Sequence, residues 1–136
     1  MPRQQERYCA GLVRDALKCA GYLENHRFDF LRGDPTPRLP RGSKLPVDAY
    51  YPEANLVLEF RESQHYKERS ELWDKRITAT GETRKLQRLK YDNRREEVLP
   101  NHGIRLLIIY DYQLTGDYDK DLGIIGIIRK AIKELK

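Results

Sequence analysis

The sequence has no apolar run near the roughly 20 residues that a membrane-spanning helix needs. Its first residues, MPRQQERYCAG, lack the apolar stretch of a signal peptide. Charged residues make up 35% of the 136 positions and hydrophobic residues 39%. A chain of this length can bury a core without disulfides or a structural metal. We therefore expect a single domain over residues 1–136 that has no membrane partner.

Cysteine is scarce, with Cys9 and Cys19 the two examples. Both fall in one predicted helix, where their spacing corresponds to roughly 15 Å at 1.5 Å per residue. That separation is too large for a disulfide. Two unpaired thiols predict a reducing, cytoplasmic setting. The chain also lacks Cys/His spacings typical of zinc sites, a Gly-rich phosphate loop, a G-x-S-x-G motif and an H-E-x-x-H motif.

Basic residues are missing from positions 45–60, although the net charge of the whole chain is +5. That stretch contains three acidic residues, Asp48, Glu53 and Glu59. Both flanks are basic: residues 32–44 carry four basic and one acidic residue, and residues 61–97 carry eleven and eight. An acidic spot between basic flanks suits a metal site that handles a polyanion. A solvated surface of mixed charge is the alternative.

Hydrophobic periodicity and turn residues predict most of the secondary structure. The expected elements are a helix over 3–21 that ends at Gly21, a strand over 26–31, a loop over 33–46, a hairpin over 47–61, helical turns over 68–77, a helix over 82–99, a buried strand over 104–110 and a helix over 119–135. Helices that bracket a four-stranded mixed sheet predict an α/β fold built as a three-layer α/β/α sandwich.

The hairpin places two acidic residues opposite each other. If Pro52 and Asn55 close the turn, paired positions have a constant sum and Asp48 faces Glu59. Alternation then gives one core face, made of Val47, Ala49, Tyr51, Leu56, Leu58 and Phe60. Opposed Cβ atoms are about 5 Å apart, so two carboxylates placed this way call for a cation, and their oxygens suit Mg²⁺. A three-residue loop would shift the register and separate the pair.

The residues around this pair match a known pattern. Pro46-Val47-Asp48, followed on the next strand by Glu59-Phe60-Arg61, resembles the PD-(D/E)XK nuclease superfamily. A longer stretch, EFRESQH at 59–65, resembles the E-x-D-G-x-x-H signature of the very-short-patch-repair-like endonucleases and their small uncharacterised relatives. LWDKRI at 72–77 and YDNRREEVLPNHGIRLLIIYDYQL at 91–114 are similar to later segments of that family, so the resemblance covers roughly residues 5–115.

The resemblance implies a restriction-endonuclease-like fold and a metal-dependent DNA endonuclease, a hydrolase that nicks or cleaves phosphodiester bonds. It implies that Asp48, Glu59 and the main-chain carbonyl of Phe60 bind Mg²⁺ or Mn²⁺. Arg61 stands where the general pattern has Lys and the narrower one often has Asp. Glu62 stands where Gly is usual. These departures bear on the activity more than on the fold.

Three further residues receive catalytic roles from the resemblance. Arg61 stays charged and cannot act as a base, but it could stabilise charge on the phosphate. His65 is the predicted general base or water-positioning group, and Glu6 is the predicted outer metal ligand or water holder. The alternatives are a polar residue at a strand end for His65 and a carboxylate that favours the helix dipole for Glu6.

Basic and amide side chains outside the hairpin are the predicted contacts to DNA. They are Arg38, Arg41, Lys44, Gln64, Lys75, Arg76, Arg84, Lys85 and Arg94. An ordinary surface loop over 33–46 is one alternative, and ion pairs of Arg94 and Arg95 with Asp92 are another. Two other functions remain open: a catalytically inactive, nuclease-like module that binds nucleic acid, and a protein-interaction domain. The sequence also leaves room for a homodimer.

Overall fold

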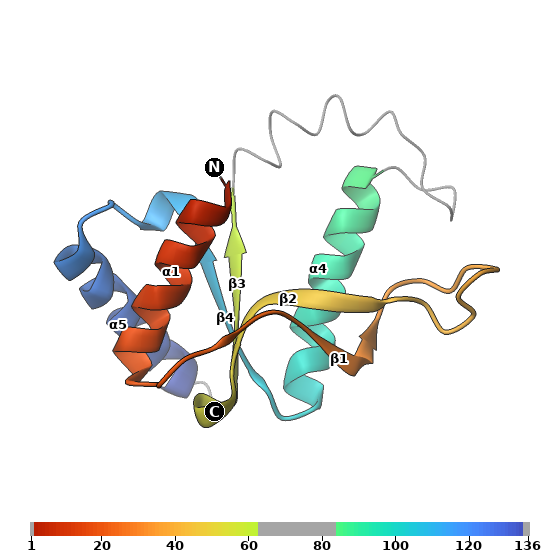
Figure 1. Cartoon of the computed structure of the whole chain (residues 1–136), viewed down its shortest axis with the longest axis horizontal. Helices are drawn as coiled ribbons and strands as arrows, with labels where there is room; N and C mark the ends of the chain where they lie inside the picture. The colour runs from red at the N-terminus through yellow and green to blue at the C-terminus, as the bar shows by residue number, and fades with distance from the viewer. Residues whose placement is uncertain (1, 63–83, 135–136) are drawn as a thin grey trace. The chain divides into compact units, whose positions relative to one another are not determined.

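The computed structural model describes residues 2–62 and 84–134 (Figure 1). Helices and strands follow one another in the predicted order, α–β–β–β–α–β–α. In chain order they are α1 (Pro2–Leu17), β1 (Leu23–Arg32), β2 (Lys44–Tyr51), η1 (Pro52–Ala54), β3 (Leu56–Arg61), α4 (Arg84–Asn101), β4 (Arg105–Tyr110), η2 (Asp111–Gln113) and α5 (Tyr118–Glu134). The helical turns predicted at 68–77 lie outside the described residues.

The four strands form one mixed sheet in the order β1-β2-β3-β4. The β2 and β3 strands are antiparallel, as a hairpin requires, whereas β3 and β4 are parallel. A parallel pair needs a long crossover connection, and α4 lies in the stretch of chain between β3 and β4. The protein is therefore an α/β protein with a four-stranded mixed sheet, as the sequence predicted.

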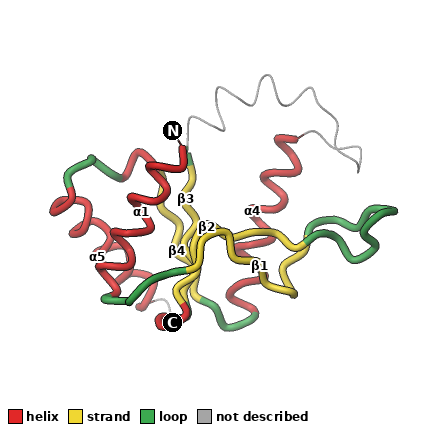
Figure 2. The backbone as a smooth tube through the Cα atoms, in the orientation of Figure 1, coloured by secondary structure: helices red, strands yellow, loops and turns green. Residues whose placement is uncertain are grey.

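The chain divides into two compact units. The first consists of Met1–His26, Val47–Glu62 and Ile104–Lys136, and the second of Arg27–Pro46 and Ser63–Gly103. Both β1 and β2 supply residues to each unit, because the boundaries fall inside these strands. The loop between β1 and β2 belongs to the second unit and appears as a long green excursion of the backbone in Figure 2. Within residues 2–62 and 84–134, no helix combines the length and the apolar character needed to cross a bilayer.

The core of the first unit lies among α1, α5 and the adjoining strands. Figure 1 shows α1 and α5 side by side, and the two helices pack against each other. The Tyr51 hydroxyl donates a 2.6 Å hydrogen bond to the main-chain oxygen of Ala10, which joins β2 to α1. All six residues of the predicted core face of the hairpin are buried, which confirms that prediction. The core cluster comprises Cys9, Ala10, Leu12, Val13, Ala49, Tyr51, Leu56, Leu58, Phe60, Leu107, Ile109 and Ile125.

Helix α1 ends four residues before the predicted cap at Gly21. Lys18 adopts the left-handed conformation, with φ of 57°. The N–H of Cys19 donates to the oxygen of Arg14 at 3.0 Å, and the N–H of Lys18 to that of Asp15 at 3.2 Å. This pair of bonds is the Schellman ending of a helix. The prediction was wrong because it assigned the left-handed position to glycine, and Cys19 consequently lies beyond the helix, as a free thiol like Cys9.

Asp121 is a fully buried carboxylate on α5 with several hydrogen-bond donors. It accepts bonds from the Tyr8 hydroxyl at 2.5 Å, from the N–H and hydroxyl of Thr115 at 2.7 and 2.8 Å, and from the N–H of Gly116 at 2.9 Å. Burial acts to raise the pKa of Asp121, but these bonds outweigh it and leave the pKa below its ordinary value. Burial and the bond to Asp121 raise the pKa of Tyr8 to about 12. Asp121 thus fastens α1 and the 115–116 turn to α5.

We expect Asp121→Asn to lower the free energy of unfolding at neutral pH by about 2 kcal/mol, because bonds to a charged acceptor are lost. The pKa of Asp121 is depressed in the folded state. Its contribution is therefore fully present above the unfolded pKa of about 3.9 and is lost as the pH falls through the folded value. Urea unfolding at a series of pH values measures the difference, with the exposed Asp119→Asn as control. A difference between wild type and variant that stays constant into strong acid would contradict this role.

Candidate functional site

The hairpin turn has the four residues that the sequence indicated. Pro52 to Ala54 form η1, and Asn55 follows with φ 51° and ψ 49° in the left-handed region, its N–H donating to the oxygen of Pro52. Proline pre-sets the backbone for such a turn, and asparagine tolerates the left-handed conformation. The resulting register pairs Ala49 with Leu58, Tyr50 with Val57 and Tyr51 with Leu56. The predicted register is therefore confirmed.

Asp48 and Glu59 lie one step further along this register. The carboxylate of each accepts a hydrogen bond from a main-chain N–H of the opposite strand. The N–H of Asp48 donates to Glu59 Oε2 at 3.0 Å. The N–H of Phe60 donates to Asp48 Oδ2 at 2.7 Å. Glu59 is buried at 5% exposure and Asp48 is half-buried. The two acidic residues are thus cross-strand neighbours, as predicted, and they hold the two strands together through reciprocal bonds.

The donor set at this position consists of oxygen atoms. Main-chain N–H groups that point at a carboxylate favour its charged form. A carboxylate has about four lone-pair positions, so one accepted N–H does not saturate it. Carboxylate oxygens and a main-chain carbonyl, such as that of Phe60, are the ligand type that Mg²⁺ and Mn²⁺ prefer. Within the described part of the chain, no group of three or more His, Cys, Asp or Glu side chains is placed to hold a metal ion.

Glu6 lies on α1, three residues before the buried Cys9. Burial raises the pKa of the Cys9 thiol to about 12, and the negative charges of Asp48 and Glu6 add to the effect. Both carboxylates must lie close to Cys9 to act on it, since interactions between charges weaken with distance. The metal or water role suggested for Glu6 stays a prediction, since the described residues include no group of three or more such side chains placed to hold an ion.

Arg61 ends β3 and lies opposite Tyr110 of the parallel strand β4. It is 9% exposed, and every residue of β3 is buried. Strand alternation places Arg61 on the same face as Glu59. Phe60, between them, turns its side chain into the core, so its contribution to a site would come from its main chain.

Several predicted site residues cannot be placed. His65, Gln64, Lys75 and Arg76 lie outside the described residues. Arg84 and Lys85 belong to the first turn of α4 by their backbone, and their side chains are also outside the described part of the chain. Their suggested roles stay predictions.

Arg94 is fastened to the segment that follows β1. Its guanidinium donates to the oxygen of Arg32 at 3.0 Å and to Asp34 Oδ1 at 2.9 Å, while Lys90 donates to Asp34 Oδ2 at 2.7 Å. The bonds from Lys90 and Arg94 hold the pKa of Asp34 below its ordinary value. Arg94 therefore pairs with Asp34, and the alternative pairing of Arg95 with Asp92 is confirmed, at 3.1 Å.

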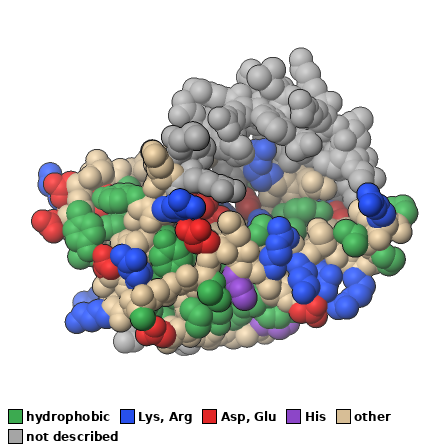
Figure 3. Space-filling model, in the orientation of Figure 1, with side chains coloured by type: hydrophobic (Ala, Val, Ile, Leu, Met, Phe, Trp, Pro, Cys, Tyr) green, Lys and Arg blue, Asp and Glu red, His purple; other side chains and the backbone are tan. Residues whose placement is uncertain are grey.

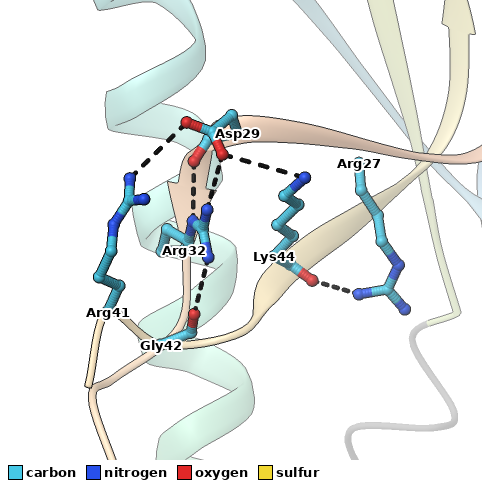
Figure 4. A network of polar contacts seen from close by, with 6 residues as sticks. All are labelled: Arg27, Asp29, Arg32, Arg41, Gly42 and Lys44. Atoms are coloured by element: carbon cyan, nitrogen blue, oxygen red, sulfur yellow. Dashed lines mark hydrogen bonds and ion pairs between the residues drawn. The ribbon is translucent and has the colours of Figure 1, made fainter. Parts of the chain in front are cut away.

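Arg41 on the loop and Lys44 at the start of β2 belong to a group of charges around Asp29, a residue that the sequence did not single out. Arg38, Arg41 and Lys44 are all exposed. Figure 4 shows Asp29 of β1 in contact with Arg41 and Lys44 from across the loop. The alternation of Arg27 and Asp29 along β1 indicates that charged side chains share one face of the strand. It does not show which cations lie near Asp29.

A separate cavity of about 680 Å³ lies in the first unit. It is lined by Leu17, Ala54, Arg105 and the part of α5 between Gly123 and Lys130. None of the predicted site residues lines it. The cavity is therefore not part of the site that the sequence indicated.

Comparisons of the chain with models of protein families, with curated proteins and with solved structures find no match. The basis for a function is accordingly the α/β fold class, the hairpin carboxylates and the distribution of charge.

Proposed function

We propose that the protein is a metal-dependent endonuclease of the PD-(D/E)XK type that nicks or cleaves phosphodiester bonds in DNA. The observation that carries the proposal is the placement of Asp48 and Glu59 as cross-strand neighbours tied by reciprocal bonds. The mixed sheet with helices before, between and after its strands is compatible with the three-layer, restriction-endonuclease-like sandwich that the proposal includes.

In this function Asp48, Glu59 and the carbonyl of Phe60 hold Mg²⁺ or Mn²⁺. The bound ion supplies a Lewis acid for the scissile phosphate and lowers the pKa of a water molecule. The main-chain bonds to Asp48 and Glu59 orient the carboxylates before any ion arrives. Arg61 attracts the phosphate and offsets its charge, because a guanidinium keeps its proton at any working pH. Glu6 holds a water molecule, and His65 takes the general-base or water-positioning role.

A second function is favoured by the same bonds. The carboxylates of Asp48 and Glu59 accept main-chain N–H groups, a structural task that needs no metal. In addition, Arg61 occupies the position where the superfamily pattern has Lys. A catalytically inactive module that binds nucleic acid on the same fold accounts for both observations.

Incubation with supercoiled plasmid separates the two functions. We expect wild type to convert the plasmid to the open-circular form with Mg²⁺ or Mn²⁺, and not with EDTA. Arg61→Lys is expected to keep much of this nicking or to raise it, because Lys supplies the same positive charge to the phosphate. Agarose gels measure the conversion. If neither protein nicks DNA with either ion, the binding module is the better description.

A further inference from the structure

Asp29 lies among several cations of the second unit. We define the Asp29 cluster as Arg27, Asp29, Arg32, Arg41 and Lys44 (Figure 4). The Asp29 carboxylate is 2.6 Å from Arg32 Nη2, 3.7 Å from Arg41 Nη2 and 3.9 Å from Lys44 Nζ. Arg27 donates to the main-chain oxygen of Lys44. Three cations therefore share one carboxylate, and Arg27 is bound to the main chain of one of them.

The cations of the cluster are held to different degrees. Arg32 also donates to the main-chain oxygens of Asp29 and Gly42, at 2.8 and 3.0 Å, and its side chain is 23% exposed. Arg41 and Lys44 lie beyond hydrogen-bond distance of Asp29, and their side chains are 75% and 46% exposed. Exposed pairs of this kind contribute little to stability. Arg32, at the end of β1, is consequently held in place, whereas Arg41 and Lys44 are readily available to another anion.

The loop between β1 and β2 is held in its conformation by main-chain hydrogen bonds. The N–H of Gly33 donates to the oxygen of Ser43 at 2.8 Å, and that of Gly42 to the oxygen of Leu39 at 2.8 Å. Thr36 and Leu39 exchange two main-chain bonds, of 2.9 and 3.1 Å. A loop that is preorganised in this way loses little conformational entropy when it binds a partner.

The local charge is strongly positive. Residues 27–44 contain five basic and two acidic residues, and one of the acidic residues, Asp34, is already neutralised by Lys90 and Arg94 of α4. In the space-filling view basic side chains gather on one part of the visible surface, with a small acidic area among them (Figure 3). A concentration of cations with a single accessible carboxylate fits a partner with repeated negative charges.

We propose that the Asp29 cluster and Arg38 bind the phosphate backbone of a duplex nucleic acid, and that Asp29 is an exchangeable counter-ion. In the free protein Asp29 partly neutralises Arg41 and Lys44. On binding, a backbone phosphate takes the place of its carboxylate at these two side chains, while Arg32 stays on its main-chain acceptors. The proposal rests on the proposed function for the kind of polyanion, and it adds where the backbone is held.

A nucleic acid fits this surface better than an anionic membrane does. Membrane-surface segments combine basic residues with several large apolar side chains. Within residues 27–46, Leu39 is the one exposed large hydrophobic residue. Guanidinium groups also match phosphate oxygens in planar, bidentate geometry, and three of the four cations of the cluster are arginines.

Fluorescence anisotropy with labelled DNA and RNA duplexes of about 20 base pairs, in EDTA and over about 50 to 200 mM salt, tests the proposal. We expect Arg41→Ala combined with Lys44→Ala to weaken binding about tenfold or more and to reduce the slope of log affinity against log salt by about 2. We expect Asp29→Asn to tighten binding by about threefold, because phosphate no longer competes with a carboxylate. A loss seen with one type of duplex supports the proposal and identifies that duplex.

Arg7→Ala combined with Lys120→Ala is the matched control, since it removes two exposed cations of the first unit. Its affinity should stay within about twofold of wild type, with a slope close to that of wild type. The proposal is overturned if the Arg41/Lys44 variant binds like this control, or if Asp29→Asn binds no more tightly than wild type. It is also overturned if vesicles of phosphatidylcholine with about one-third phosphatidylserine bind through Arg41 and Lys44 while neither duplex binds.

Because EDTA prevents metal-dependent cleavage, these results do not depend on the nuclease activity. A protein that binds duplexes as expected but never nicks plasmid would retain this surface and lose the proposed enzymatic function. A protein that nicks plasmid but binds equally well without Arg41 and Lys44 would retain the function and lose this surface.

Discussion

Asp48→Asn is expected to abolish plasmid nicking while duplex binding stays intact or becomes tighter. The amide oxygen of Asn can still accept the N–H of Phe60, so the hairpin keeps its geometry. The negative charge that a divalent ion needs is lost, and we expect activity to fall by more than about 100-fold, the most that the loss of an outer-shell partner of a metal typically costs. Removal of a negative charge next to a polyanion also favours binding. Nicking on agarose gels, with filter binding in parallel, measures both effects.

Glu53→Gln is the control for this experiment. Glu53 is an exposed carboxylate in the turn of the same hairpin, where it accepts the N–H of Ala20 at 3.0 Å. The Glu53→Gln substitution removes one negative charge from the hairpin and leaves Asp48 and Glu59 unchanged, so nicking should be unchanged. A variant at Asp48 that nicks as fast as wild type would show that this carboxylate is structural, and the metal site would have to be abandoned.

Gly42→Ala is expected to cause the largest loss of stability. Gly42 has φ of +80°, and a Cβ atom at this position would stand 2.0 Å from the main-chain oxygen of Gly33. The neighbours are backbone atoms that cannot move aside without breaking the loop. We expect the free energy of unfolding to fall by about 4 kcal/mol, at the upper end of what single substitutions cost. Urea unfolding measures this loss.

Gly103→Ala separates the cost of a left-handed backbone from the cost of the close approach to Gly33. Gly103 has a similar φ of +76°, but an added Cβ would meet nothing within 4 Å. Its substitution carries the left-handed backbone cost alone, about 1 to 2 kcal/mol. Equal losses for the two alanine variants would mean that the loop relaxes around residue 42 and that its close approach to Gly33 is not essential.

The sequence was most informative where local chemistry decides the structure. Pro52 and Asn55 select a four-residue turn, and the alternation of apolar residues along 47–60 then determines the register, so the opposition of Asp48 and Glu59 could be predicted. The end of α1 was not predicted because Lys18 adopts a left-handed conformation that glycine usually takes. Nothing in the local sequence at 18–21 shows that lysine would be preferred to Gly21.

Contacts between distant residues were beyond the reach of sequence patterns. Arg94 was assigned to phosphate or to Asp92, but its partner is Asp34, 60 positions away. The environment of Asp29 was not predicted, because Arg41 and Lys44 lie on the other side of a loop. The path of that loop depends on Gly33 and Gly42. Asp121 lies in the helix predicted over 119–135, and its bond to the Tyr8 hydroxyl joins residues too far apart in the sequence for that pattern to show.

The bond between Tyr8 and Asp121 joins residues 113 positions apart. During synthesis, α1 is made before β2 and β3, but β4 and α5, which complete the core against it, are made only after the second unit. Native contacts of such long range slow folding. The core against Leu12 and Val13 therefore stays incomplete until α5 is made, a period in which chaperones bind such surfaces and neighbouring chains aggregate through them.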